Sequence, residues 1–198
     1  MLKIEKILIV LLVLIVALIL IITKKSYGQR YQDGSWGLQA SIYPYYNFTE
    51  AYRDNKFKAF NLGFARYGYN YTRSTGELFY SEKKVITDFY KTDIKEYIAS
   101  YGYGFPVIAV WQNFFNVFVD FGALVGFTEV KNYDEVNANI KSPFKQGVTF
   151  GAYGQLNAEM TLFDFLTLFA RAQLSYNGFV VYERWPFYQG FGVRIVFN

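Results

Sequence analysis

The sequence predicts an all-β protein, an eight-stranded antiparallel transmembrane up-and-down β-barrel preceded by an N-terminal apolar signal helix. Apolar and polar residues alternate in several stretches, most clearly after Gln146, and a period of two is typical of extended strands. Most of these stretches have roughly the 9–11 residues that a tilted strand needs to cross a bilayer. The connections alternate between long polar loops and short turns, as they do in outer-membrane barrels.

The composition fits a barrel that contacts lipid. Aromatic residues make up 22% of the 198 residues, with 19 Tyr and 21 Phe, and aromatic girdles are typical of outer-membrane barrels. Removing residues 1–28, which carry four lysines and one glutamate, lowers the net charge from +4 to +1, so charge does not favour direct binding of nucleic acid. Because Cys and His are absent, disulfides, histidine-dependent triads and histidine metal ligands are excluded.

Residues 1–28 have the pattern of a targeting segment. Two lysines precede one apolar run over residues 7–22, and small residues near its end fit cleavage after Gly28. Lys24 and Lys25 are atypical so close to a cleavage site, and the run is short for a membrane span. We therefore expect a cleaved signal peptide or a retained inner-membrane anchor over residues 1–28, followed by a barrel over residues 29–198.

The first three predicted strands cover residues 34–44, 57–67 and 71–80. In the first strand every second residue from Trp36 to Ile42 is apolar, and in the second strand Phe60, Leu62 and Phe64 share one face. The third strand has the weakest alternation. A polar loop over residues 45–55 and a tight turn over residues 68–70 separate the three strands.

The next two predicted strands cover residues 94–105 and 115–127. The first of them alternates Tyr and Ala with Ser and Gly, and it ends before Pro106, where a missing backbone donor does little harm. The second alternates an apolar face with a face that includes Asp120. We predict a loop over residues 81–93, with strand extensions into it as the alternative, a loop over residues 128–145 and a short connection over residues 106–113.

The last three predicted strands cover residues 148–160, 166–176 and 190–197. Apolar side chains recur at every second position from Val148, from Leu166 and from Phe191. A turn over residues 163–165 and a polar loop over residues 177–186 connect them. Aromatic residues near the ends of the predicted strands favour belts at the membrane interfaces; these are Trp36, Tyr43, Tyr45, Tyr46, Tyr67, Tyr69, Trp111, Phe114, Tyr176, Trp185 and Phe187.

The polar face of the predicted strands is rich in Gly, Ser, Gln and Asn and carries few charges, which favours a filled lumen over a water-exposed surface. Its charged residues are Glu96, Asp120, Glu159, Arg171 and Arg194. We predict that they form an interior ion-pair network, because an unpaired buried charge is costly, and a pore lining or a proton-linked site stays open as the alternative. No nucleophile lies near a base, so we predict no enzyme activity, no catalytic residues, no cofactor and no metal site.

Several motifs after Gln29 resemble the TraO proteins of conjugative transposons. They are NVFV at residues 116–119, GALVGF at 122–127, GA at 151–152, EMTL at 159–162, LTLFARAQ at 166–173, GVRIVFN at 192–198 and the Gly28-Gln29-Arg30 junction. The resemblance covers most of the chain after Gln29. It implies a small outer-membrane barrel with a role in conjugative DNA transfer and with other conjugation proteins as partners, and it supplies no catalytic residues.

Three functions follow from these patterns. The first is a non-enzymatic barrel in the cell outer membrane that is a structural or accessory component of a conjugative transfer apparatus. The second is a general small outer-membrane barrel, in adhesion or envelope stability, with no link to conjugation. The third is a periplasmic barrel, anchored in the inner membrane, that binds an apolar ligand. Outer-membrane lipid is the expected partner of the first two, and the oligomeric state stays open.

Overall fold

The computed structural model describes residues 33–46, 53–86, 91–110, 114–133, 146–178 and 185–197. The predicted signal segment over residues 1–28 lies outside the described residues. The strands are β1 (Trp36–Tyr46), β2 (Arg53–Tyr67), β3 (Arg73–Ile86), β4 (Lys91–Val110), β5 (Phe115–Tyr133), β6 (Gly147–Phe163), β7 (Leu166–Asn177) and β8 (Phe187–Phe197). A short 3₁₀ turn, η1 (Tyr69–Tyr71), joins β2 to β3. Among the described residues no helix is long and apolar enough to cross a membrane.

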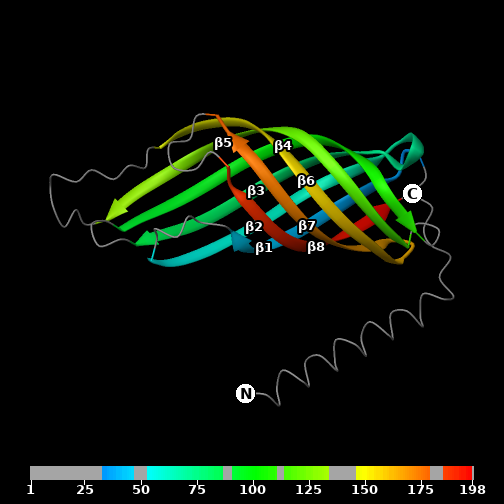
Figure 1. Ribbon diagram of the computed structural model, residues 1–198, viewed down its shortest axis with the longest axis horizontal. Coiled ribbons are helices and arrows are strands. Elements are labelled where there is room, and N and C mark those ends of the chain that lie inside the picture. The colour runs from blue at the N-terminus through cyan, green and yellow to red at the C-terminus, as the bar shows by residue number, and fades with distance from the viewer. Residues whose placement is uncertain are drawn as a thin grey trace, which may run out of the picture.

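The eight strands form a closed barrel in sequence order, with each strand antiparallel to its neighbours and β1 paired with β8. The turns that follow β2 and β6 lie at the same end as the C-terminus (Figure 1); we call this the turn end and the opposite end the loop end. The predicted eight-stranded antiparallel up-and-down barrel is confirmed.

Side chains alternate between the outer wall and the lumen as the sequence predicts. Val148 and Val193 are 51% and 43% exposed on the outer wall, whereas Gln155 and Arg171 are 5% and 4% exposed. The exposed side chains of the wall are large and apolar, and they include Leu62, Leu78, Phe121, Phe150 and Phe191. An apolar surface of this extent is seldom left in water, and a closed barrel satisfies its backbone hydrogen bonds within lipid. The wall therefore faces hydrocarbon.

Strands β3, β4 and β5 are longer than predicted at the loop end. Residues 81–86, 91–93 and 128–133 lie in strands that pair in continuous register. The prediction of a loop over residues 128–133 was therefore wrong, and between residues 81 and 93 the alternative of strand extensions is correct for residues 81–86 and 91–93. The reason is that the outward positions of these extensions are charged or polar, as in Glu82, Lys84, Asp93 and Glu129. Where a strand extends beyond the membrane, its outward residues are no longer apolar, so the sequence lacks the apolar–polar alternation by which a strand is recognised.

The connection predicted over residues 106–113 was also partly wrong, because β4 continues to Val110. Pro106 does not end the strand. The pairing of β4 with β5 shifts between Pro106 and Ile108 and then resumes as far as Val110 and Phe115. A bulge at the residue that lacks a backbone donor lets the ladder continue beyond it.

At the loop end, an aromatic row on the outer wall is followed directly by a charged row. Phe60, Tyr80, Tyr97 and Phe127 pair across β2 to β5. The ring centroids of Phe60 and Tyr80 lie 5.2 Å apart, and those of Tyr80 and Tyr97 lie 5.3 Å apart. The next outward row, two residues further along each strand, is Lys58, Glu82, Lys95 and Glu129. The hydrocarbon layer therefore ends between these two rows, since aromatic girdles flank the apolar band.

At the turn end, the β2–β3 connection is a tight turn near its predicted position. Asn70 and Tyr71 have φ of 57° and 60°, and the Thr72 N–H donates to the Tyr69 carbonyl at 3.3 Å. Two successive positive φ values characterise a type I′ turn, which matches the twist of a hairpin. The third strand begins at Arg73, two residues later than predicted, because the turn occupies residues 69–72.

The predicted aromatic belts are only partly correct. Trp36, Tyr69, Tyr176 and Trp185 are exposed. Tyr43 and Tyr67 are buried in the lumen at 2% and 1% exposure, because each lies on the inward parity of its strand, and for them the belt prediction was wrong. Trp111 and the side chains of Tyr45 and Tyr46 lie outside the described part of the structure.

Candidate functional site

All five charged residues of the predicted network lie buried in the lumen: Glu96, Asp120, Glu159, Arg171 and Arg194. The structure brings four of them together and sets Glu96 apart. It also adds three charged residues that the sequence analysis missed, Arg73, Glu77 and Lys83, all of them on β3 and buried.

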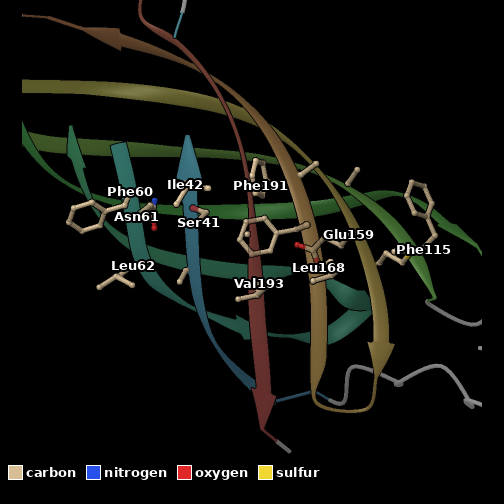
Figure 2. A pocket seen from close by; sticks show the side chains of 16 residues that line it. Ser41, Ile42, Phe60, Asn61, Leu62, Phe115, Glu159, Leu168, Phe191 and Val193 are labelled. Carbon is tan, nitrogen blue, oxygen red and sulfur yellow. The ribbon is translucent and has the colours of Figure 1, made fainter. Parts of the chain in front are cut away.

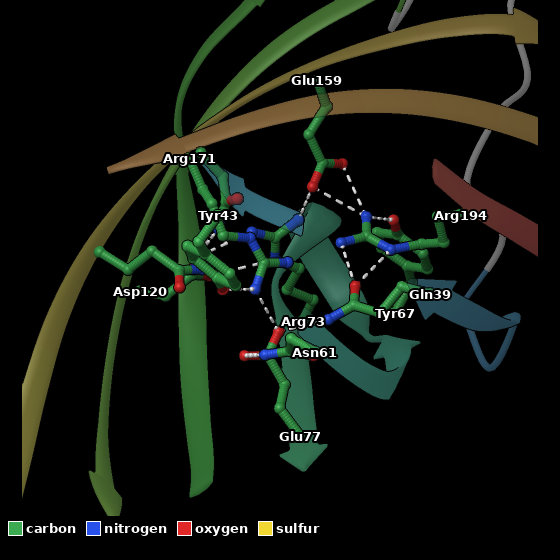
Figure 3. A network of polar contacts seen from close by, with 12 residues as sticks. Gln39, Tyr43, Asn61, Tyr67, Arg73, Glu77, Asp120, Glu159, Arg171 and Arg194 are labelled. Atoms are coloured by element: carbon green, nitrogen blue, oxygen red, sulfur yellow. Dashed lines mark hydrogen bonds and ion pairs between the residues drawn. The ribbon is translucent and has the colours of Figure 1, made fainter. Parts of the chain in front are cut away.

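Glu159 links two of the arginines in the lumen (Figure 3). Its carboxylate accepts hydrogen bonds from Arg194 Nη1, at 2.8 Å to each oxygen, and from Arg73 Nη1. One carboxylate on β6 therefore joins arginines on β3 and β8, which lie on different sides of the barrel. Gly37 makes room for this arrangement on β1, since a Cβ there would meet Arg194 Cδ at 2.7 Å.

Asp120 binds the other side of the Arg73 guanidinium. Arg73 Nε and Nη2 donate to its two oxygens at 3.0 and 2.8 Å, which is the bidentate geometry of a strong arginine–carboxylate pair. Asn157 and Gln155, on β6, also donate to Asp120. The Arg73 guanidinium lies 4.1 Å from the centre of the Phe118 ring. Arg73 therefore has a carboxylate on two sides and an aromatic face on a third.

Glu77 and Gln39 extend the network across the lumen. Glu77 accepts from Arg171 Nη1 and from Asn61, both at 2.7 Å, and from Gln39. The Gln39 side-chain oxygen accepts from Arg194 Nε and Nη2 at 2.9 and 2.6 Å. These bonds join Arg171, Glu77, Gln39 and Arg194 into one chain that continues through Glu159.

The network is balanced in charge. It holds three arginines and three carboxylates, namely Arg73, Arg171, Arg194, Glu77, Asp120 and Glu159, and all six are buried. Removing a charge from water costs several kcal/mol, and paired, hydrogen-bonded partners are needed to offset that cost. A balanced network therefore suits a structural interior and gives no reason for a mobile ion to bind there.

Apolar side chains close the lumen on both sides of the network. Towards the turn end, Ala65, Tyr67, Phe118 and Val196 form one buried cluster. Towards the loop end, Tyr43, Phe79 and Tyr188 meet edge to face, with ring centroids 5.1–6.1 Å apart. The Tyr67 hydroxyl is bonded to Arg194 and the Tyr43 hydroxyl to Arg171. Both clusters are therefore tied to the charged layer between them.

Glu96 belongs to a second, smaller group nearer the loop end. It pairs with Lys83 Nζ at 2.7 Å and accepts from the Ser81 hydroxyl at 2.7 Å. Lys83 lies above the aromatic row, between the outward-facing Glu82 and Lys84. Burial lowers the pKa of the Lys83 ammonium, and the neighbouring Glu96 carboxylate acts in the opposite direction.

Two features of β3 explain why these three residues were missed. Arg73 and Glu77 lie on β3, where outward Ser74 and Gly76 are not apolar, so the alternation that marks a lumen face is hidden. Lys83 lies in the segment predicted as a loop. A signal was available, because Arg73, Thr75, Glu77, Ser81 and Lys83 are polar residues of a single parity.

The outer wall carries a hollow of about 640 Å³ across β1, β2, β6, β7 and β8. Ala40, Ala158 and Ala170 are among the residues that line it, and the side chains of Phe60 and Phe191 stand beside it (Figure 2). The hollow lies on the lipid-facing wall, so acyl chains of the bilayer fill it.

No group of three or more potential metal ligands occurs in the described ranges, and the lumen lining is polar, which does not suit an apolar ligand.

Comparisons with known proteins identify the fold. No family model and no curated protein matches the chain. OprG from Pseudomonas aeruginosa is 13% identical, with a TM-score of 0.54, over 86% of this chain and 99% of OprG. Ail, the attachment invasion locus protein of Yersinia pestis, is 12% identical, with a TM-score of 0.52, over 84% of this chain and 100% of Ail. Neisserial surface protein A is 12% identical, with a TM-score of 0.51, over 82% of this chain and 97% of that protein.

At such identities the likeness concerns the fold alone, and it agrees with the surface of the barrel. The closed eight-stranded barrel has an apolar outer wall, an aromatic row where that wall ends, and the topology of solved outer-membrane proteins. The chain is a small β-barrel of the cell outer membrane, in contact with membrane lipid.

Proposed function

We propose that the chain is a non-enzymatic outer-membrane barrel with a closed lumen, and that its role in adhesion or envelope stability is carried by the surfaces at its two ends. The balanced lumen network between two apolar clusters is the observation that carries this proposal. An ion crossing the lumen would have to separate buried arginine–carboxylate pairs such as Arg73 with Asp120, and breaking one such pair costs about 3–5 kcal/mol.

The surface at the loop end supports the same role. Strands β3, β4 and β5 continue beyond the charged row to Ile86, Lys91 and Tyr133, so a twisted sheet projects past the membrane. Ail, one of the proteins that share the fold, is described as an attachment invasion locus protein. A projecting sheet on a rigid, filled barrel is a suitable support for a contact surface.

Conductance tests the closed lumen directly. Purified protein whose folding is verified by a gel shift between unheated and boiled samples is added to a planar bilayer. The proposal predicts no stepwise current above that of the bare bilayer. Regular single-channel steps from the folded fraction would overturn it.

Deletion of the gene tests the cellular role. We expect weaker attachment to surfaces or greater sensitivity to detergent, restored by the wild-type gene. A deletion strain that matches its parent in both assays would contradict the proposed role.

A second candidate is a structural or accessory part in conjugative transfer, with other conjugation proteins as partners. It is favoured by the TraO-like motifs, above all GALVGF at residues 122–127 and GVRIVFN at residues 192–198. Transfer frequency after deletion separates the two candidates: a large loss of transfer with normal attachment supports conjugation, and unchanged transfer removes it. We also propose that residues 1–28 direct export, and sequencing of the mature N-terminus decides between cleavage and retention.

A further inference from the structure

The outward face at the loop end carries charges of alternating sign in register. Lys58, Glu82, Lys95 and Glu129 pair with one another across β2, β3, β4 and β5. Neighbouring strands lie about 4.8 Å apart, so the two lysines of this charged row are about 10 Å apart. No ion pair within 4 Å joins Lys58 or Lys95 to another described residue.

The charged row lies at a defined depth. It is two residues above the aromatic row, a step of about 7 Å along a strand. Its side chains share the parity of Phe60, Leu78, Tyr97 and Val125, all of which face lipid. The charged row is therefore a continuation of the lipid-contacting wall into the layer where hydrocarbon gives way to lipid headgroups.

We propose that the charged row binds phosphate groups on the headgroups of outer-leaflet lipid, with Lys58 and Lys95 as the principal ligands. The loop end faces the cell exterior, because the short turns of such barrels lie on the periplasmic side. An ammonium is a compact charge that suits a single phosphate. The proposal rests on the membrane placement and is independent of whether the barrel serves adhesion or conjugation.

The environment of Lys95, a half-buried residue, keeps its ammonium charged. The negative charges of the Tyr80 phenolate, formed only at high pH, and of the Glu129 carboxylate raise the pKa of Lys95. In the next outward row, by contrast, a lysine has a carboxylate partner, since Lys84 pairs with Asp93 at 3.8 Å. Lys58 and Lys95 are thus the outward lysines nearest the hydrocarbon that lack a described carboxylate partner within 4 Å.

The spacing distinguishes separate phosphates from a continuous polyanion. Duplex DNA presents one charge per roughly 1.7 Å, and a protein that binds it needs a dense basic patch. Here the lysines alternate with Glu82 and Glu129, whose carboxylates would repel a continuous row of phosphates such as that of DNA. Lysines held apart by carboxylates fit single phosphate groups on neighbouring lipid molecules.

The test measures binding of fluorescent, phosphorylated lipid A by the full-length folded barrel in detergent micelles. We expect Lys58→Gln and Lys95→Gln each to raise the Kd about fivefold, as for a cation near an anionic surface, and the double variant about 25-fold. Arg66→Gln is the matched control, because it removes an exposed cation at the turn end, where Arg66 lies over Trp36. Its Kd should stay within about twofold of the wild type, too small a change for a lost phosphate contact. The gel shift on heating shows that each variant is folded.

Two further arms identify the ligand. Dephosphorylated lipid A should bind the wild type as weakly as phosphorylated lipid A binds the double variant, and excess inorganic phosphate should leave the wild-type Kd unchanged. Equal affinity for the two lipids, or an equal loss with Arg66→Gln, would overturn the proposal. Full competition by inorganic phosphate would also overturn it, since it would indicate a site for free phosphate. A conducting lumen would refute the proposed function without affecting any of these results.

Discussion

Replacing Glu159 with Gln should destabilise the barrel more than any other single carboxylate-to-amide change. The variant keeps the size of the side chain and removes its charge. Arg73 and Arg194 both donate to Glu159, and without its charge the three arginines of the network are left with two network carboxylates, Asp120 and Glu77. Removing one partner of a buried ion pair costs about 3–5 kcal/mol, because it leaves an uncompensated buried charge. We expect the free energy of unfolding to fall by about that amount.

The assay is urea unfolding of the barrel in phospholipid vesicles, followed by the fluorescence of its three tryptophans. Glu129→Gln is the matched control, since it makes the same chemical change on the exposed outer face, where the unfolding midpoint should barely move. The double variant Glu159→Gln with Arg194→Gln should recover part of the loss, because both charges of one pair are then gone. Equal midpoints for Glu159→Gln and Glu129→Gln would refute the reasoning and indicate a hydrated lumen.

Three other changes probe the turn, the lumen packing and the lipid-facing wall by the same unfolding assay. Tyr71→Gly should stabilise the barrel by about 1 kcal/mol, because Tyr71 has φ of 60°, which favours glycine; glycine at Thr72, where φ is −63°, should destabilise it. Gly102→Ala should lower the free energy of unfolding by about 1–3 kcal/mol, since a Cβ there meets the Tyr153 hydroxyl and lies 2.7 Å from the Phe121 carbonyl. Gly147→Ala is the control and should leave the free energy of unfolding nearly unchanged, because a Cβ there has no other atom within 4 Å. Equal losses of stability in the two variants would contradict the packing around Gly102. Leu156→Arg, at an exposed position midway along β6, should lower the free energy of unfolding in a bilayer by about 2–4 kcal/mol. No change in the free energy of unfolding would mean that this position contacts water.

The charged residues predicted for the lumen are single charges on the polar face of strands whose opposite face is apolar. Asp120, Glu159 and Arg171 each lie between apolar outward neighbours, so parity alone assigns them to the interior. Parity also assigned Tyr43 inward, while its place near a strand end suggested an interfacial belt, and the structure follows parity. A side chain's direction is fixed by the pleat of its strand, whereas position along the strand only suggests its depth.

The partners within the network could not be predicted, because they depend on closure of the barrel. Gln39 lies beside Arg194 only because β1 pairs with β8 in one register, and Arg73 reaches Glu159 across the lumen from three strands away. The extent of the strands beyond the membrane could not be predicted for a related reason. Residues 81–86 form a strand because they pair with β4, and no local pattern in the sequence predicts that pairing.

The orientation of the strands is the central claim, and a cysteine scan along β7 tests it most directly. The chain has no cysteine of its own, so each introduced thiol can carry a fluorophore without background. In bilayers that contain brominated lipid, we predict strong quenching at Leu168, Ala170 and Ala172 and weak quenching at Thr167, Phe169 and Ser175. Quenching of the opposite parity, or without alternation, would contradict a barrel whose charged side chains fill its interior.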